Sequence, residues 1–225
     1  MNLPSYYLTP PNERFDSETI PSFERLFLDQ VQNASGRVID YSLPAPKWQF
    51  LNYLADTREV VVHGSGNRNI SLFEPRQSND VKEFGDQRAV YAASDGIWAM
   101  YYAVIDRDRY VRSLVNSCIH PVSENGQSDQ AERHYFFSIN QDALSHKPWR
   151  TGTVYLLPRK TFEAEETKSD RKSTQWRSFV SVKPLAQIEV LPSDFPFLDQ
   201  IRGHNVDEVQ RRATENPDGF PWLDD

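Results

Sequence analysis

The chain has 225 residues, of which 38% are apolar and 12% aromatic, and this is enough to bury one sizeable hydrophobic core. Its 25 basic and 32 acidic side chains are interspersed and leave a net charge of -7, which argues against general binding to nucleic acids or anionic membranes. The one cysteine, Cys118, cannot form an intramolecular disulfide. No secretory leader pattern opens the sequence and no apolar run approaches the roughly 20 residues of a membrane span, so we expect a cytoplasmic protein.

The first quarter of the chain predicts an arm followed by two helices. Residues 1–15 hold three prolines and no sustained period, which is typical of an extended arm. Apolar residues recur at helical spacing from Phe23 to Val31 and predict an amphipathic helix that ends before Gly36. After a proline break, residues 47–56 repeat the helical pattern and predict a second helix.

The middle of the chain predicts two strands and an apolar helix. The continuous β-branched run at residues 60–62 is typical of a strand buried on both faces. A polar stretch covers residues 66–88, and residues 89–94 then predict a short strand that leads directly into an apolar helix at 96–107. Residues 106–129 contain loop-forming sequences, and we expect this region to be irregular.

The second half predicts mainly strands, with one exposed connection and one helix. Strands are expected at residues 134–139, 153–159, 176–182 and 186–192. The charged segment 160–174 is expected to be an exposed connection. A last helix is expected at residues 205–215, followed by a tail whose Phe220 and Trp222 can dock on the core.

We find no internal repeat and no linker rich in glycine or serine, so we expect one domain over residues 1–225. Its fold class is α+β, with a mixed β-sheet and flanking helices. Residues 1–57 form the amino-terminal arm and helices packed on the core, and residues 194–225 form the carboxyl-terminal helix and tail.

Two segments carry a functional pattern. The first predicted strand ends in a His-Gly-Ser sequence, and the later strand carries a tyrosine followed by small residues and a helix with a second tyrosine eleven residues on. The positions concerned are His63, Gly64, Ser65, Tyr91, Ala93 and Tyr102. This pattern resembles the diphtheria-toxin-like ADP-ribosyltransferases, the superfamily that contains the poly(ADP-ribose) polymerases. In that family a strand ends in His-Gly-Ser or His-Gly-Thr, and a later G-I-Y-F-A strand precedes a helix with S-x-S-A-x-Y.

The resemblance implies an ADP-ribosyltransferase-like fold that binds NAD as a substrate and cleaves the bond between nicotinamide and ribose. It assigns His63 to the adenosine-side ribose, Gly64 to the carboxamide, and Tyr91 with Tyr102 to the two faces of the nicotinamide ring. The chemistry of these side chains is suitable. A histidine can donate a hydrogen bond to a ribose hydroxyl, a glycine lets the backbone approach the ligand, and tyrosines stack on flat rings.

The family's catalytic acid has no direct counterpart here. In the family this acidic residue begins a late strand, and in the segment QWRSFVSVKPLAQIEV that place is taken by Gln175. A glutamine can accept the same hydrogen bond but carries no charge with which to stabilise a developing cation. Ala99 stands where the family often has a serine that bonds the carboxamide. Should another residue supply the charge, Glu163 and Glu189 are the next to test.

Two arginines flank the polar stretch that follows the histidine. Arg68 and Arg76 are placed to reach a pyrophosphate bidentately, and the alternative is that both are solvated or ion-paired loop residues. The five histidines show no metal-binding spacing and one cysteine excludes a zinc ribbon, so no metal cofactor is expected.

We therefore expect an NAD-binding, ADP-ribosyltransferase-like protein whose catalytic residues are His63, Tyr91 and Gln175 and whose acceptor is a protein, a nucleic acid or a small molecule. Two alternatives stay open. One is a non-catalytic binding module of the same fold, which the uncharged Gln175 favours. The other is an RNA 2'-phosphotransferase-like enzyme of related fold, against which the net charge of -7 argues.

Overall fold

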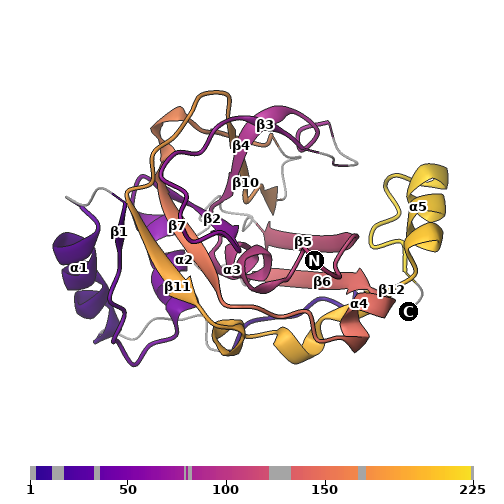
Figure 1. The fold of residues 1–225 in the computed structure, drawn as a ribbon, viewed down its shortest axis with the longest axis horizontal. Helices are drawn as coiled ribbons and strands as arrows, with labels where there is room; N and C mark the ends of the chain where they lie inside the picture. Colours follow the sequence, from indigo (N-terminus) through magenta and orange to yellow (C-terminus); the bar gives the residue numbers. More distant parts are fainter. Residues whose placement is uncertain are drawn as a thin grey trace.

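Two β-sheets with a helix between them dominate the fold (Figure 1). The structure is a computed structural model, and it describes residues 4–11, 18–32, 36–78, 80, 83–121, 133–166 and 171–223. Five α-helices lie in these ranges: α1 (Thr19–Gln30), α2 (Lys47–Thr57), α3 (Gly96–Val104), α4 (Gln141–Ser145) and α5 (Val206–Glu215). The fold is therefore of the mixed α+β class that the sequence predicts.

The larger sheet contains eight strands. In spatial order it runs β1 (Arg37–Val38), β11 (Ala186–Val190), β7 (Gly152–Pro158), β2 (Val60–Ser65), β4 (Arg88–Ala93), β10 (Gln175–Ser178) and β8 (Glu163–Ala164), and β3 (Arg76–Gln77) pairs with β4. The smaller sheet runs β12 (Arg202–His204), β6 (His134–Asn140), β5 (Leu114–Pro121) and β9 (Arg171–Lys172). The β1–β11 and β12–β6 pairs are parallel and the other pairs are antiparallel.

Apolar periodicity predicts most of these elements correctly, and the errors are concentrated in polar sequence. Residues 106–129 were expected to be irregular, and 106–113 form turns and loop, but Leu114–Pro121 forms β5. The rest of that region, 122–129, lies outside the described residues. In β5 only Val115 and Ile119 are fully buried, because its polar side chains bond to neighbouring elements instead of facing a uniform apolar layer. The segment 160–174, expected as a connection, holds the two-residue strands β8 and β9.

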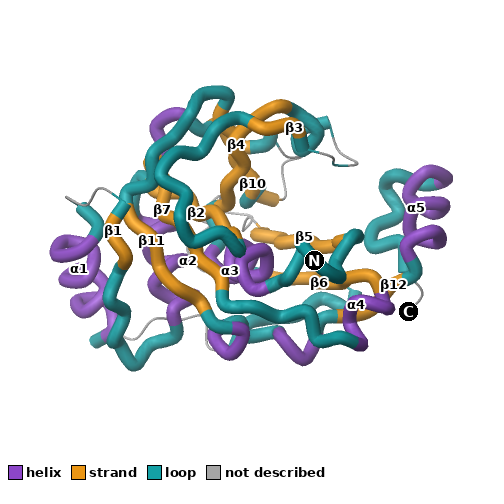
Figure 2. The backbone as a smooth tube through the Cα atoms, in the orientation of Figure 1, coloured by secondary structure: helices purple, strands orange, loops and turns teal. Residues whose placement is uncertain are grey.

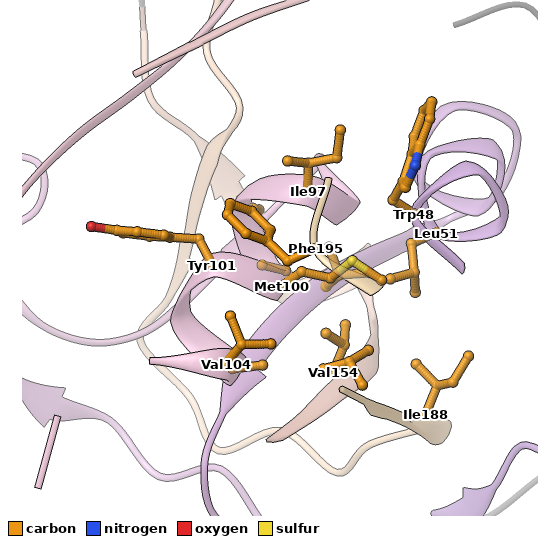
Figure 3. Packing of buried hydrophobic residues seen from close by; sticks show 14 of the residues in the cluster. Trp48, Leu51, Ile97, Met100, Tyr101, Val104, Val154, Ile188 and Phe195 are labelled. Atoms are coloured by element: carbon orange, nitrogen blue, oxygen red, sulfur yellow. The ribbon is translucent and has the colours of Figure 1, made fainter. Parts of the chain in front are cut away.

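Helix α3 lies between the two sheets (Figure 2). Its residues are apolar on nearly every face. Its Ile97, Met100 and Tyr101 are completely buried. Figure 3 shows Met100 pointing toward Leu51 of α2, above Val154 of β7, within the largest hydrophobic cluster. A helix without a polar face is stable only when it is covered on all sides, so the position of α3 follows from its composition.

The two ends of the described chain pack together on the smaller sheet. The ring of Tyr7 stacks on Phe220 with centroids 6.5 Å apart, and Phe220 contacts Phe136 of β6 edge to face at 5.5 Å. Trp222 contacts Phe220 at 5.5 Å. The arm and the tail therefore cover a small third cluster of buried residues, whereas α1 and α2 pack on the main core. Among the described residues, no helix has the length and apolarity that a bilayer span requires.

A buried histidine joins three parts of the smaller sheet. Ser138 Oγ donates to the carbonyl of Arg202 (3.1 Å), so it accepts from Nδ1 of His204 (2.7 Å). Nε2 of His204 is then unprotonated and accepts from Ser113 Oγ (2.9 Å). Burial disfavours the charged ring and lowers the pKa of His204 from 6.5 to about 4.

This histidine predicts a loss of stability in mild acid. Between pH 6.5 and pH 4 the unfolded chain binds a proton at His204 that the folded chain does not, so the free energy of unfolding is complete above pH 6.5 and falls by up to about 3 kcal/mol as the pH drops to 4. Urea denaturation at pH 7.5 and pH 4.5 measures this loss. His204→Gln is expected to flatten the slope relative to the wild type, and equal slopes in the two proteins would contradict the assignment.

Candidate functional site

The candidate site begins where β2 and β4 separate. The two strands are paired only at Val62 and Ala93, whereas β2 pairs with β7 along its whole length. Hydrogen-bonding directions alternate along an antiparallel strand, and Arg159 N donates to Glu59 O (2.9 Å) at the start of the β2–β7 ladder. By this alternation the N–H and C=O of Gly64 point away from β7 and toward β4. Within the described ranges no β4 residue is in register with Gly64, so both groups face the opening between the strands.

We call this opening, bounded by Gly64 and Tyr91, the β2–β4 gap. His63 reaches across it, with Nδ1 2.6 Å from the carbonyl oxygen of Tyr91. A carbonyl only accepts, so Nδ1 carries the proton. Burial lowers the pKa of His63 below 6.5, and the ring is neutral at pH 7. Nε2 therefore accepts hydrogen bonds and cannot donate one to a ribose hydroxyl, which corrects the direction expected from the sequence.

Gly64 is also where α3 rests on the sheet. A Cβ added to Gly64 would lie 1.7 Å from the carbonyl oxygen of Ala99 and 2.9 Å from the nitrogen of Ala103. The contact is between two backbones, so no side-chain movement could relieve it. The glycine thus has a packing role in addition to any role in binding. Ala99, at the position where the family often has a serine, meets the strand here through its backbone carbonyl.

The two tyrosines are each held by their hydroxyl groups. Tyr91 OH accepts from Gln87 N (2.9 Å), so its ring runs back along β4 toward the start of the strand. Tyr102 OH donates to Asn116 Oδ1 of β5 (3.2 Å). Burial raises the pKa of both hydroxyls, and the carboxylate of Asp80 raises both further, so the two groups lie near one charge. The rings of Tyr91 and Tyr102 make no direct contact in the described part of the chain.

The register of β10 places Gln175 with respect to the gap. Gln175 is opposite Ala93, and Ala93 is opposite Val62, so the three form a row across the sheet on one face. Tyr91 shares this face because it is two residues from Ala93. The structure therefore brings Gln175 to the face of the sheet that carries Tyr91 and α3.

A carboxylate that sequence reasoning missed lies next to Gln175. Glu165 N donates to Gln175 O (3.0 Å), and the Glu165 carboxylate accepts from Ser173 Oγ (2.8 Å). Ser173 Oγ also accepts from Gln175 N (3.0 Å). The only signal for this arrangement is the pairing of β8 with β10, and a two-residue strand has no periodicity from which to predict it.

The two acids named from the sequence have ion-pair partners. Glu163 pairs with Arg177 Nε (2.8 Å), and Glu189 pairs with Arg68 (3.1 Å). Both carboxylates are more than half exposed, with side-chain exposures of 55% and 52%. Arg68 is therefore the ion-paired loop arginine of the alternative interpretation. Glu163 and Glu189 are compensated by these cations, which leaves Glu165 as the carboxylate beside Gln175.

Arg76 lies on β3, opposite Ala89, which is two residues from Tyr91 along β4. It lines a separate hollow of about 500 Å³ together with Glu74, Pro75, Arg88, Phe179 and Ser181. Neither His63 nor Gly64 lines this hollow. Ser65, the third residue of the His-Gly-Ser sequence, accepts from Asn67 N (3.1 Å) and stabilises the turn that follows β2.

Among the described residues we find neither a metal-binding cluster nor an activated thiol. In the ranges that the structure describes, no three His, Cys, Asp or Glu side chains gather so that they could hold a metal ion. Burial raises the pKa of Cys118 well above its usual value, so its thiol is protonated at neutral pH. Comparison of the chain with protein-family models, curated proteins and solved structures finds no match.

The contact between α3 and β2 predicts a large cost for a small substitution. Gly64→Ala forces the Cβ into the Ala99 carbonyl, and we expect the free energy of unfolding to fall by about 3 kcal/mol. Gly36→Ala is the control, because its Cβ would meet nothing within 4 Å and its φ of +71° costs about 1 kcal/mol. Urea denaturation compares the two variants. A Gly64→Ala cost no larger than that of Gly36→Ala would contradict the close packing.

Proposed function

We propose that this chain binds NAD with its nicotinamide in the β2–β4 gap, as an ADP-ribosyltransferase-like protein. The observation that carries the proposal is the direction of the Gly64 peptide groups. A primary carboxamide has one acceptor and two donor hydrogens, and it matches an N–H and a C=O presented side by side by one residue. Gly64 presents these groups toward the gap because β4 does not continue the ladder beyond Val62.

The residues around the gap support the same ligand. Tyr91 on β4 and Tyr102 on α3 are the two aromatic side chains that we assign to the flat nicotinamide ring. The unprotonated Nε2 of His63 accepts a hydrogen bond from a ribose hydroxyl, since Nδ1 is engaged by Tyr91 O. Gln175, on the face of Tyr91, is available to orient a second ribose hydroxyl.

In the proposed reaction the bond between the nicotinamide nitrogen and ribose C1' breaks, and its electron pair leaves with nicotinamide. The cationic C1' is captured by an oxygen or nitrogen of water or of the acceptor, which releases its proton to solvent. Gln175 offers no negative charge to this cation, so turnover is expected to be slow. A non-catalytic NAD-binding module is the second candidate function, and the uncharged side chain at Gln175 is the observation that favours it.

The role of His63 predicts a loss of affinity on truncation. His63→Ala leaves a ribose hydroxyl without its acceptor and is expected to weaken NAD binding by roughly 1 to 3 kcal/mol. His146→Ala is the matched control, because His146 is an exposed histidine stacked on Tyr110 and is expected to leave NAD affinity unchanged. Titration calorimetry measures both variants. Equal affinity in the wild type and His63→Ala would remove His63 from the site.

Because Gln175 carries no charge, introducing a carboxylate at this position is expected to increase turnover. Gln175→Glu is expected to increase nicotinamide release from NAD by about two to three orders of magnitude, because preorganised charge of this kind is typically worth about 3 to 4 kcal/mol. Gln210→Glu adds the same charge on the exposed face of α5 and is expected to change nothing. Brisk wild-type turnover that survives Gln175→Ala would contradict the assignment. In that event Glu165→Gln tests whether the neighbouring carboxylate is responsible.

A further inference from the structure

The further inference concerns Arg107, an arginine near the carboxyl end of α3. Arg107 lies in the turn that directly follows α3, and its side chain is exposed. Its guanidinium carbon is 5.8 Å from the centroid of the Tyr102 ring, within range of a cation–π interaction. The turn is attached to the helix that rests on Gly64, so Arg107 has a defined place relative to the gap.

The two carboxylates next to Arg107 in sequence form ion pairs with another arginine. Asp106 and Asp108, its neighbours in sequence, both pair with Arg150, the first at 3.4 Å. Within the described part of the chain no carboxylate forms an ion pair with Arg107. Arg68 and Arg177, by contrast, have glutamate partners. Arg107 is therefore an uncompensated cation in a chain whose net charge is negative.

The field of this cation reaches the residues of the gap. Its charge lowers the pKa of His63 and the pKa of the Tyr102 hydroxyl, in both cases as a smaller effect than burial. The geometry places the guanidinium carbon 5.8 Å from the centroid of the Tyr102 ring, and its charge also acts on His63. A dinucleotide with its nicotinamide ring at Tyr102 and its adenosine-side ribose at His63 would have its diphosphate between these two residues, within the range of this charge.

We propose that Arg107 binds the diphosphate of the dinucleotide whose nicotinamide occupies the β2–β4 gap. This inference rests on the proposed function. The diphosphate joins the two riboses of NAD, and a guanidinium presents donors in a planar fork that matches phosphate oxygens bidentately. Because Arg107 is exposed and unpaired, it can move from the Tyr102 ring to the phosphates without breaking an ion pair.

The test compares NAD with nicotinamide, the part of NAD that lacks the diphosphate, both riboses and the adenine. Wild type, Arg107→Ala and Arg107→Lys are titrated calorimetrically with NAD and with nicotinamide, which has no phosphate. Arg109→Ala is the matched control, an exposed arginine in the same turn for which no contact with the Tyr102 ring is found among the described residues. We expect Arg107→Ala to weaken NAD binding about tenfold and to leave nicotinamide binding unchanged, as removal of one charge-assisted contact should. Arg107→Lys should recover part of the loss.

The outcomes separate this inference from the function on which it rests. Wild-type binding of NAD that Arg107→Ala does not weaken would overturn the role of Arg107 and leave the proposed function in place. Equal weakening of NAD and nicotinamide would also overturn it, because the contact would then be to the ring. Failure of the wild type to bind either ligand would overturn both the proposed function and the role of Arg107.

Discussion

The buried carboxylate of Asp95 holds together the parts of the molecule on which the site depends. Asp95 is completely buried and caps α3 by accepting from Trp98 N (2.7 Å). Its second oxygen accepts from Tyr135 OH of β6 (2.7 Å) and lies 3.6 Å from Arg133 Nε. One terminal nitrogen of Arg133 also donates to both carboxylate oxygens of Asp56, near the end of α2 (2.6 and 2.7 Å). One acidic residue therefore joins the start of α3 to the smaller sheet and, through Arg133, to α2.

The position of α3 in turn shapes the β2–β4 gap. With its amino end fixed at Asp95, the helix passes directly over Gly64, and its Trp98 and Tyr102 both donate to Asn116 of β5. These bonds fix the Trp98 and Tyr102 side chains against the smaller sheet. His63 completes the arrangement by bonding to the Tyr91 carbonyl where β4 has left the ladder. The packing that stabilises the fold and the geometry proposed for binding therefore depend on the same few contacts.

The sequence predicts an element correctly where its apolar residues form a clear pattern. It fails where the position of an element or a side chain depends on pairing between strands. Helices α2 and α3 and the central strand β2 are predicted correctly because each is a nearly continuous run of residues that are buried in the fold. Strand β5 was missed because half-buried polar residues such as Asn116 interrupt its pattern. The place of Glu165 opposite Gln175 is a matter of register, and the tautomer of His63 follows from one carbonyl across the gap. Neither the place of Glu165 nor the tautomer of His63 can be predicted from the residues next to it in the sequence.

The central claim is that the β2–β4 gap receives a carboxamide at Gly64. Crystals of the protein soaked with nicotinamide test it most directly. We expect the carboxamide to bond to the N–H and C=O of Gly64, with its ring between Tyr91 and Tyr102. Nicotinamide found instead in the hollow beside Arg76, or a gap left empty at a saturating concentration of the ligand, would contradict the account.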